Sequence, residues 1–107
     1  MTEVPFVERK FELDGGELVV CFFTPSKAPG GEFHCRYVIG WPKREVRRYA
    51  CGLDGLQALM LAMRTVHTEL IESDAYKAGR LTWCDRANLD LPPTWGEGSL
   101  YDPPPRP

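Results

Sequence analysis

The sequence lacks any run of apolar residues long enough to cross a membrane. A spanning helix needs about 20 consecutive apolar residues, and nothing in the 107-residue chain approaches this. The first residues, MTEVPFVERKF, also lack the basic start and apolar core of a secretory signal. We therefore expect a cytoplasmic protein, and the short, compact chain favours a bacterial source.

Closely spaced metal or redox motifs are missing as well. The four cysteines are widely and irregularly spaced, with no C-x-x-C pair: Cys21, Cys35, Cys51 and Cys84. In a reducing compartment such thiols are typical of small buried apolar residues. A zinc site with His34 or His67 and a disulfide between Cys21 and Cys35 are the alternatives. We predict no metal and no cofactor.

An excess of charge of one sign is absent too. The net charge is −2, the sequence pI is about 5.7 and apolar residues make up 43%. These values are ordinary for a soluble globular protein and give no global attraction to nucleic acid. The length fits one domain, which we place at 1–91. The remainder, 92–107, contains six prolines among sixteen residues, so we predict an extended tail there.

The first half of the chain predicts strands. Residues 6–13 alternate in polarity, as in a half-buried strand, and Asp14-Gly15 before the next apolar run is typical of a hairpin turn. Further strands are expected at 17–24, 33–40 and 44–51. The facing of the last is open: either Val46 and Ala50 or Tyr49 and Cys51 point inward.

A long amphipathic helix is expected over residues 53–73. Asp54 is a suitable N-cap, and Gln57 three positions later completes a capping-box pattern. Seven apolar residues form the predicted buried stripe: Leu56, Leu59, Met60, Met63, Val66, Leu70 and Ile71. Gly79 is expected to end further helical structure, and 80–84 to form a short edge strand. Together these elements predict an α+β fold: a four- to five-stranded antiparallel meander sheet with one long helix packed across one face, followed by the Pro-rich C-terminal tail.

The stretch LVVCFF, residues 18–23, is apolar on both sides of its strand. One helix covers only one face of a sheet, so the other apolar face needs a second cover. We assign Leu18, Val20, Phe22 and Val38 to that second face as a candidate interface. The cover could be the tail with Trp95, Leu100 and Tyr101 as anchors, a second copy of the chain, another protein, or strong curvature of the sheet itself.

Positive charge concentrates in residues 36–48, where five basic residues stand against Glu45 alone, a local charge of +4. With its aromatic neighbours this segment is the candidate binding site: Arg36, Trp41, Lys43, Arg44, Arg47, Arg48 and Tyr49. It could bind an acidic protein surface or a nucleic-acid strand, or simply be a solvated hairpin.

Nothing in the sequence predicts catalysis. His34 and Cys35 are neighbours on a strand and therefore point to opposite faces. Glu69, Glu72 and Asp74 look like a solvated helix end, and Tyr76, Lys77 and Arg80 are interpreted as structural rather than functional residues.

The strand ERKFEL, the helix start LDGLQALMLAM and the segment AYKAGRLTW together resemble a family of small bacterial proteins known only as a domain of unknown function. The likeness covers residues 7–83 and implies a compact α+β domain, with no catalytic residues to carry over. Such a scaffold suits immunity proteins that neutralise a toxin. We therefore expect a non-enzymatic cytoplasmic protein that acts through protein–protein contact, with an immunity- or antitoxin-like role as the most concrete version. The alternative is a small-ligand or single-stranded nucleic-acid binder that uses the basic 36–48 hairpin.

Overall fold

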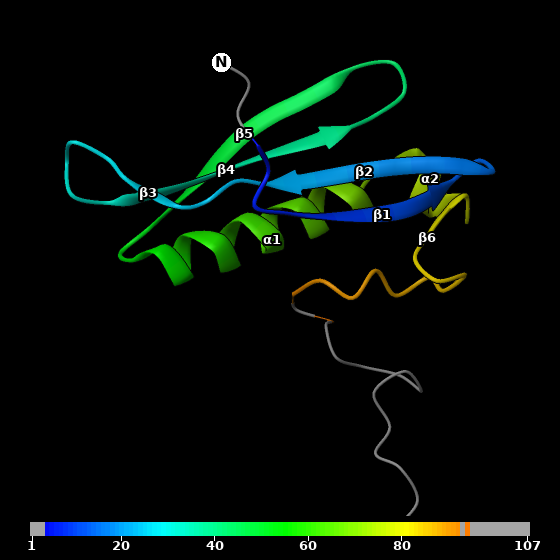
Figure 1. Cartoon of the computed structure of the whole chain (residues 1–107). Helices are drawn as coiled ribbons and strands as arrows, with labels where there is room; N and C mark the ends of the chain where they lie inside the picture. Colours follow the sequence, from blue (N-terminus) through cyan, green and yellow to red (C-terminus); the bar gives the residue numbers. More distant parts are fainter. Residues whose placement is uncertain (1–3, 93, 95–107) are drawn as a thin grey trace, which may run out of the picture.

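A six-stranded antiparallel sheet with one main helix packed against it forms the fold (Figure 1), as seen in a computed structural model that describes residues 4–92 and 94. The elements follow in the order β1 (Val7–Leu13), β2 (Gly16–Phe22), β3 (Ser26–Lys27), β4 (Phe33–Gly40), β5 (Glu45–Gly52), α1 (Gly55–Ile71), α2 (Asp74–Lys77) and β6 (Leu81–Thr82). β4 pairs with β5 on one side and with β2 and β3 on the other, while β1 joins β2 to β6. The predicted α+β fold with an antiparallel meander is confirmed. The short edge strand expected at 80–84 is the two-residue β6, and the two-residue β3 is a sixth strand that the sequence did not predict.

The first hairpin turns at Asp14 and Gly15, as the Asp-Gly pair predicts. Both residues have positive φ, 52° and 80°, which the type I′ turn of a two-residue hairpin requires. This turn fixes the register, in which Phe11 pairs with Leu18 and Arg9 with Val20. Paired residues of neighbouring strands lie on the same face of the sheet. Because Phe11 is buried, Leu18 and Val20 of β2 lie in the same core.

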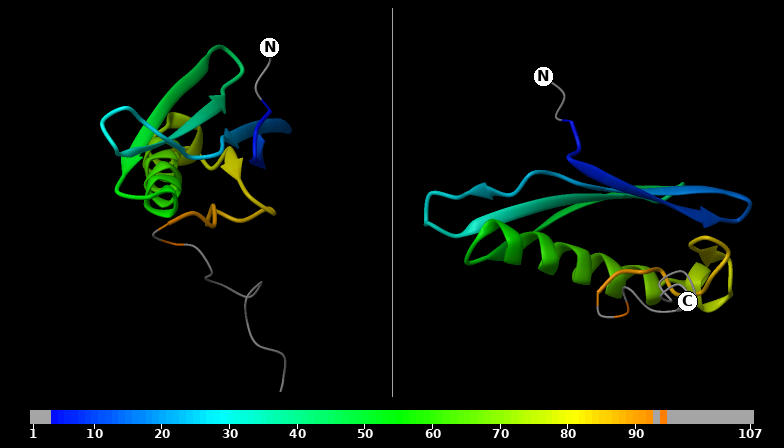
Figure 2. Two further views of the ribbon diagram at one scale, coloured as in Figure 1. Left: turned by 60° about the vertical axis from the view of Figure 1, so that its left-hand side comes forward. Right: turned by 60° about the horizontal axis from the view of Figure 1, so that its bottom comes forward.

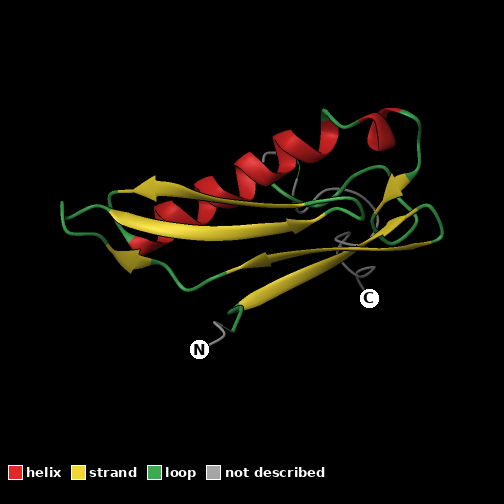
Figure 3. Ribbon diagram, turned by 90° about the horizontal axis from the view of Figure 1, so that it is seen from above, coloured by secondary structure: helices red, strands yellow, loops and turns green. Residues whose placement is uncertain are grey.

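Helix α1 begins as predicted. The Asp54 carboxylate accepts a hydrogen bond of 2.8 Å from the Gln57 N–H, and the Gln57 side chain accepts one of 2.6 Å from the Leu53 N–H. The helix then packs against β4 and β5 (Figure 3). Its terminus near Gly52 lies so close to the sheet that a Cβ at this glycine would stand 2.9 Å from the Ala58 Cα.

The predicted helix stripe is partly wrong, because the helix is rotated toward its small residues. Ala58, Ala62, Val66 and Leu70 are each 0% exposed, whereas Leu56 is 67% and Met60 43% exposed. Alanines let the helix axis approach the sheet closely, and the larger side chains flank the contact. Leu59, Met63 and Ile71 accordingly pack at the edge of the core.

A second cover lies on the same side of the sheet as the helix (Figure 2): the segment 84–92, which passes beneath β1 and β2. Leu89 and Leu91 are buried in the core. Arg9 holds the segment by donating from Nη1 to the carbonyl oxygens of Leu89 at 3.1 Å and Asp90 at 2.7 Å. Its guanidinium also lies 4.4 Å from the ring centre of Trp83.

The assignment of Leu18, Val20 and Phe22 to an uncovered face is wrong. They are 0%, 0% and 4% exposed and belong to the core that α1 and the 84–92 segment cover. The physical reason is the two-residue turn, which places Leu18 beside the buried Phe11. Val38 does lie on the opposite face, paired with Cys21, and there the apolar residues of β2 are Val19 and Cys21, followed by Phe23.

The strand whose facing was open follows the first alternative: Val46 is buried and Ala50 packs against the core, while Tyr49 and Cys51 are exposed. None of the described helices is long and apolar enough to cross a membrane. Apart from Pro92 and Thr94, the predicted tail, with its proposed anchors Trp95, Leu100 and Tyr101, lies outside the described residues.

Candidate binding surfaces on the basic hairpin

The β4–β5 hairpin divides the basic candidates between two sides of the sheet. Register pairs Val38 with Arg47 and Arg36 with Tyr49, and alternation puts these residues on the face away from α1. Arg48 points the other way, where its guanidinium lies 3.6 Å from the Glu69 carboxylate on α1. The single binding surface predicted from residues 36–48 is therefore two surfaces.

The first surface is a hollow on the face away from α1, which we call the open-face hollow. It has a volume of about 230 Å³ and is lined by Phe23, Arg36, Tyr37, Val38, Arg47, Arg48 and Tyr49. Phe23 and Val38 form its apolar part and are each only 8% exposed. The Arg36 guanidinium lies 5.4 Å from the Phe23 ring centre, so long charged side chains shield the apolar floor with their stems.

The rim of this hollow carries stacking and ion-pair contacts. The His34 and Tyr49 rings stack with centres 4.5 Å apart. Arg47 Nε donates to Glu45 at 2.8 Å, with both side chains at least half exposed. An exposed pair of this kind is worth about 0–1 kcal/mol, so Arg47 can exchange its partner at little cost.

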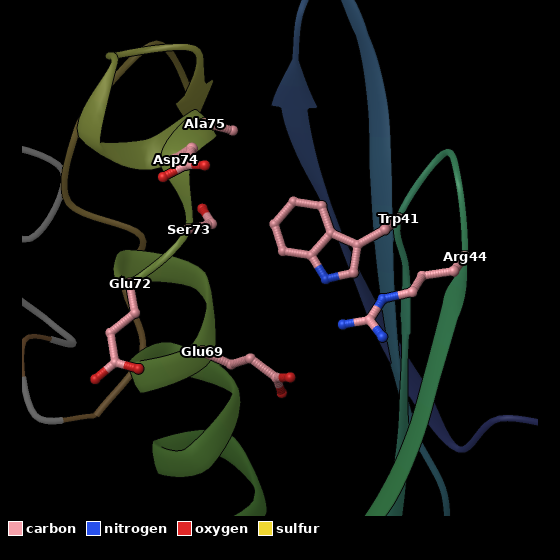
Figure 4. A pocket seen from close by; sticks show the side chains of 7 residues that line it. All are labelled: Trp41, Arg44, Glu69, Glu72, Ser73, Asp74 and Ala75. Carbon is pink, nitrogen blue, oxygen red and sulfur yellow. The ribbon is translucent and has the colours of Figure 1, made fainter.

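The second surface lies on the helix side, between the hairpin turn and the junction of α1 with α2 (Figure 4). Trp41 and Arg44 project from the hairpin toward Glu69, Ser73 and Ala75, and the cavity between them, also lined by Glu72 and Asp74, has a volume of about 350 Å³. Burial raises the pKa of the nearby Tyr37 hydroxyl, and the charge of Glu69 raises it further.

A neighbouring cavity of about 600 Å³ continues around the turn. It is lined by Leu13, Asp14, Trp41, Pro42, Lys43, Arg44, Ala75 and Arg80. Trp41, Arg44 and Ala75 line both cavities, so we treat the two as one feature and call it the Trp41 trough. Lys43, the remaining basic candidate, belongs to this feature.

The cysteines and histidines do not converge. All four cysteines are free, and among residues 4–92 and 94 no three or more His, Cys, Asp or Glu side chains are grouped so as to hold a metal. Burial raises the pKa of the Cys35 thiol, which donates to the Phe23 carbonyl at 3.4 Å. A thiol with a raised pKa is a poor nucleophile.

His67 is a buried residue at the edge of the core, 6% exposed. Its Nε2 lies 3.4 Å from the Thr94 hydroxyl, which also has the Asn88 side-chain oxygen and the Leu91 carbonyl at 3.2 Å each. Those two acceptors compete for the hydroxyl proton, and burial lowers the pKa of His67. The contact therefore ties Thr94 to α1 and does not resemble an activated nucleophile.

Sequence reasoning missed the residues that complete the Trp41 trough. The sequence predicts a solvated helix end for Glu69, Glu72 and Asp74, yet all three belong to the lining of this cavity, and the Glu69 side chain points toward the hairpin (Figure 4). The lengths of α1 and β5 could have predicted this placement, because α1 starts where β5 ends and runs back along it. A 17-residue helix spans about 26 Å, and an 8-residue strand spans nearly the same length at about 3.3 Å per residue. The end of the helix must therefore lie beside the start of β5.

Comparison with known proteins adds the family. Residues 7–93 match the family described as Domain of unknown function (DUF6968). The chain belongs to the DUF6968 family. The resemblance seen in the sequence is thereby confirmed, and the matched range includes the 84–92 segment that covers β1 and β2. No curated protein and no solved structure matches the chain.

Proposed function

We propose that this DUF6968 protein is a non-enzymatic protein of the bacterial cytoplasm that binds an acidic surface of another protein through the open-face hollow. The observation that carries the proposal is the combination of an apolar floor, Phe23 and Val38, with the arginines Arg36 and Arg47 on a sheet face that α1 leaves uncovered. Interfaces commonly combine a small apolar centre with arginine and tyrosine side chains. An acidic partner supplies the complementary charge.

An immunity- or antitoxin-like role is the most concrete version of this proposal. It predicts a partner gene beside this one and a tight complex of the two products. Self-association through the same face is disfavoured, because a two-fold axis would bring the arginine-rich hollows of both copies together. The oligomeric state of the pure protein, measured by light scattering, distinguishes the two: a monomer supports the acidic partner.

The test compares two variants that each remove two positive charges. Arg36→Ser with Arg47→Ser alters the hollow, whereas Lys10→Ser with Lys27→Ser removes two exposed lysines elsewhere on the sheet. We expect affinity capture from the native cells to recover a partner that rising salt releases, that the lysine variant retains and that the arginine variant loses. Equal capture of the partner by both variants would contradict binding through the open-face hollow.

Single-stranded nucleic acid is the second candidate ligand, favoured by the stacked His34–Tyr49 pair beside Arg36 and Arg47. Fluorescence anisotropy with a labelled single-stranded oligonucleotide tests it. Binding that falls steeply with salt and is lost in Arg36→Ser with Arg47→Ser would favour this alternative. Arg48 is a poor choice for this test, because its guanidinium pairs with Glu69 on the other side of the sheet.

A further inference from the structure

Strand β5 forms a long free edge of the sheet. It pairs with β4 over its full length, from Glu45 to Gly52, without a bulge, and it contains no proline. Among the described residues it makes no backbone hydrogen bond to any other element. Proteins commonly protect such edges with very short strands, bulges or prolines. The strands β3 and β6 have two residues each, whereas β5 has none of these protections.

The backbone groups that face the free edge follow from the hydrogen-bond ladder. In an antiparallel pair the N–H and C=O of one residue point to the same side of the strand, and those of the next residue point to the other side. The Arg36 carbonyl accepts a hydrogen bond of 2.9 Å from the Phe23 N–H, so the backbone of Arg36 points away from β5. Tyr49 is paired with Arg36, and its N–H and C=O therefore point to the free edge. Alternation adds Arg47 and Cys51, and all three of these β5 residues are exposed.

Helix α1 extends beneath the place that an added strand would take. Seen from above, the helix crosses under β4 and β5, and its second half emerges beyond β5 (Figure 3). Ala62 faces the sheet, and Met63 lies on the flank that meets the 84–92 segment. At about 3.6 residues per turn, Leu61 and Thr65 lie on the opposite flank, toward the free edge, where both are at least partly exposed. The helix therefore provides an uncharged support for side chains on the inner side of an added strand.

The side chains along the edge determine which strand can be added. Arg47 lies on the open face, where its side chain is 68% exposed and its ion-pair partner Glu45 is 50% exposed. Opposite charges directly across a strand pair are stabilising, and like charges are destabilising. A second copy would bring Arg47 and Arg48 of another β5 to the same edge, so charge disfavours pairing of β5 with itself. An acidic strand of another protein has the complementary charge.

We propose that β5 binds an extended segment of the partner protein as an added antiparallel strand, with acidic side chains on the open face and apolar side chains on the α1 side. An acidic residue then lies opposite Arg47, and apolar residues lie above Leu61 and Thr65. Main-chain hydrogen bonds supply affinity in this mode of recognition, and the alternating side chains supply specificity. Strand addition rests on the proposed function, because it describes how the acidic partner is held beside the open-face hollow.

The first experiment uses an acetylated and amidated peptide of alternating residues, Glu-Val-Glu-Val-Glu-Val-Glu, and the full-length protein. In the proposed pairing the glutamate amides face β5 and the valine amides face solvent. We expect ¹H–¹⁵N NMR to show binding of the peptide and of a form N-methylated at its valines, with slowed hydrogen exchange of the Arg47, Tyr49 and Cys51 amides. A form N-methylated at its glutamates, and a peptide with lysine in place of glutamate, should lose binding. No binding of the parent peptide, equal binding of the two methylated forms, or the reverse preference would overturn the proposal.

Substitutions at Cys51 separate strand addition from the proposed function. Cys51 does not line the open-face hollow, and a proline there removes an N–H that faces the free edge without the loss of a bond to β4. Cys51→Pro is expected to bind the peptide about two- to ten-fold more weakly than Cys51→Ala, which retains the N–H, because one hydrogen bond is lost. Equal affinity of these two variants would contradict strand addition, and if Arg36→Ser with Arg47→Ser still lost the peptide, the hollow would remain the binding site. The methylated peptides leave the protein unchanged, so they decide the question even if Cys51→Pro is unfolded by circular dichroism.

Discussion

Replacing Gly52 with alanine should destabilise the protein more than any other glycine-to-alanine change in the sheet. A Cβ at this position would stand 2.9 Å from both the Ala58 Cα and the Gln57 carbonyl carbon. These are backbone atoms of the first helical turn, so the helix itself must move. Overpacking of this kind costs about 1–3 kcal/mol, which lowers the melting temperature by about 4–8 °C for each kcal/mol in a domain of this size.

Gly16→Ala is the matched control for this prediction. Its new Cβ would meet the Leu13 carbonyl oxygen at 3.6 Å, an ordinary contact. The lost backbone freedom of the unfolded chain stabilises such a variant by up to about 1 kcal/mol. Urea unfolding followed by circular dichroism measures both variants. If Gly52→Ala unfolded at the same urea concentration as Gly16→Ala, the close packing of α1 on β5 would be refuted.

Three further predictions follow from buried or hydrogen-bonded groups. Burial lowers the pKa of His67 below its ordinary 6.5, so the unfolded chain binds the extra proton and the free energy of unfolding should fall as pH drops below about 6.5. The variant His67→Gln should abolish this dependence of stability on pH, as measured by denaturant unfolding over a series of pH values. An unchanged pH dependence in the variant would exclude His67 as its source. A hydrogen bond from the Asp85 N–H, together with further hydrogen bonds, lowers the pKa of Glu12, so the stabilisation of the fold by this carboxylate should be complete above pH 4.5 and be lost as pH falls toward the lowered pKa. The variant Glu12→Gln should lower the melting temperature at neutral pH and reduce the loss of stability in acid. Identical melting of the two proteins in acid would contradict this role of Glu12. Leu18→Ala should cost about 2–5 kcal/mol, whereas Leu56→Ala at an exposed helix position should change the free energy of unfolding by less than about 0.5 kcal/mol; equal effects in urea would contradict the core assignment.

Local signals in the sequence were sufficient for the long elements of the fold, but not for the two-residue strand β3. Asp14-Gly15 sets a hairpin turn, and Asp54 with Gln57 sets the helix start, because each depends on side chains and backbone within a few residues. The prediction of which side chains of β2 are buried was wrong. Every residue of LVVCFF is apolar, so alternation within the strand carries no information. The information was in the turn, since a two-residue loop pairs Phe11 with Leu18.

The candidate site was predicted as a segment but not as a geometry. Charge density found residues 36–48, yet it could not show that Arg47 and Arg48 point to opposite sides of the sheet. The acidic partners of the Trp41 trough come from the far end of α1, distant in sequence, and only the return of the helix along β5 brings Glu69 to the hairpin. The rotation of α1 toward Ala58 and Ala62 likewise depends on the close packing of two elements, which hydrophobic periodicity alone does not encode.

The most direct test of the central claim, that partner proteins bind the sheet face away from α1, is photocrosslinking in living cells. The photoreactive residue p-benzoylphenylalanine replaces Tyr49, which is 56% exposed on the open face, or Leu53, which is 87% exposed before α1. We predict a crosslinked adduct of higher mass at position 49 that disappears in Arg36→Ser with Arg47→Ser, and none at position 53. An adduct at position 53 alone, or at neither position, would contradict the account.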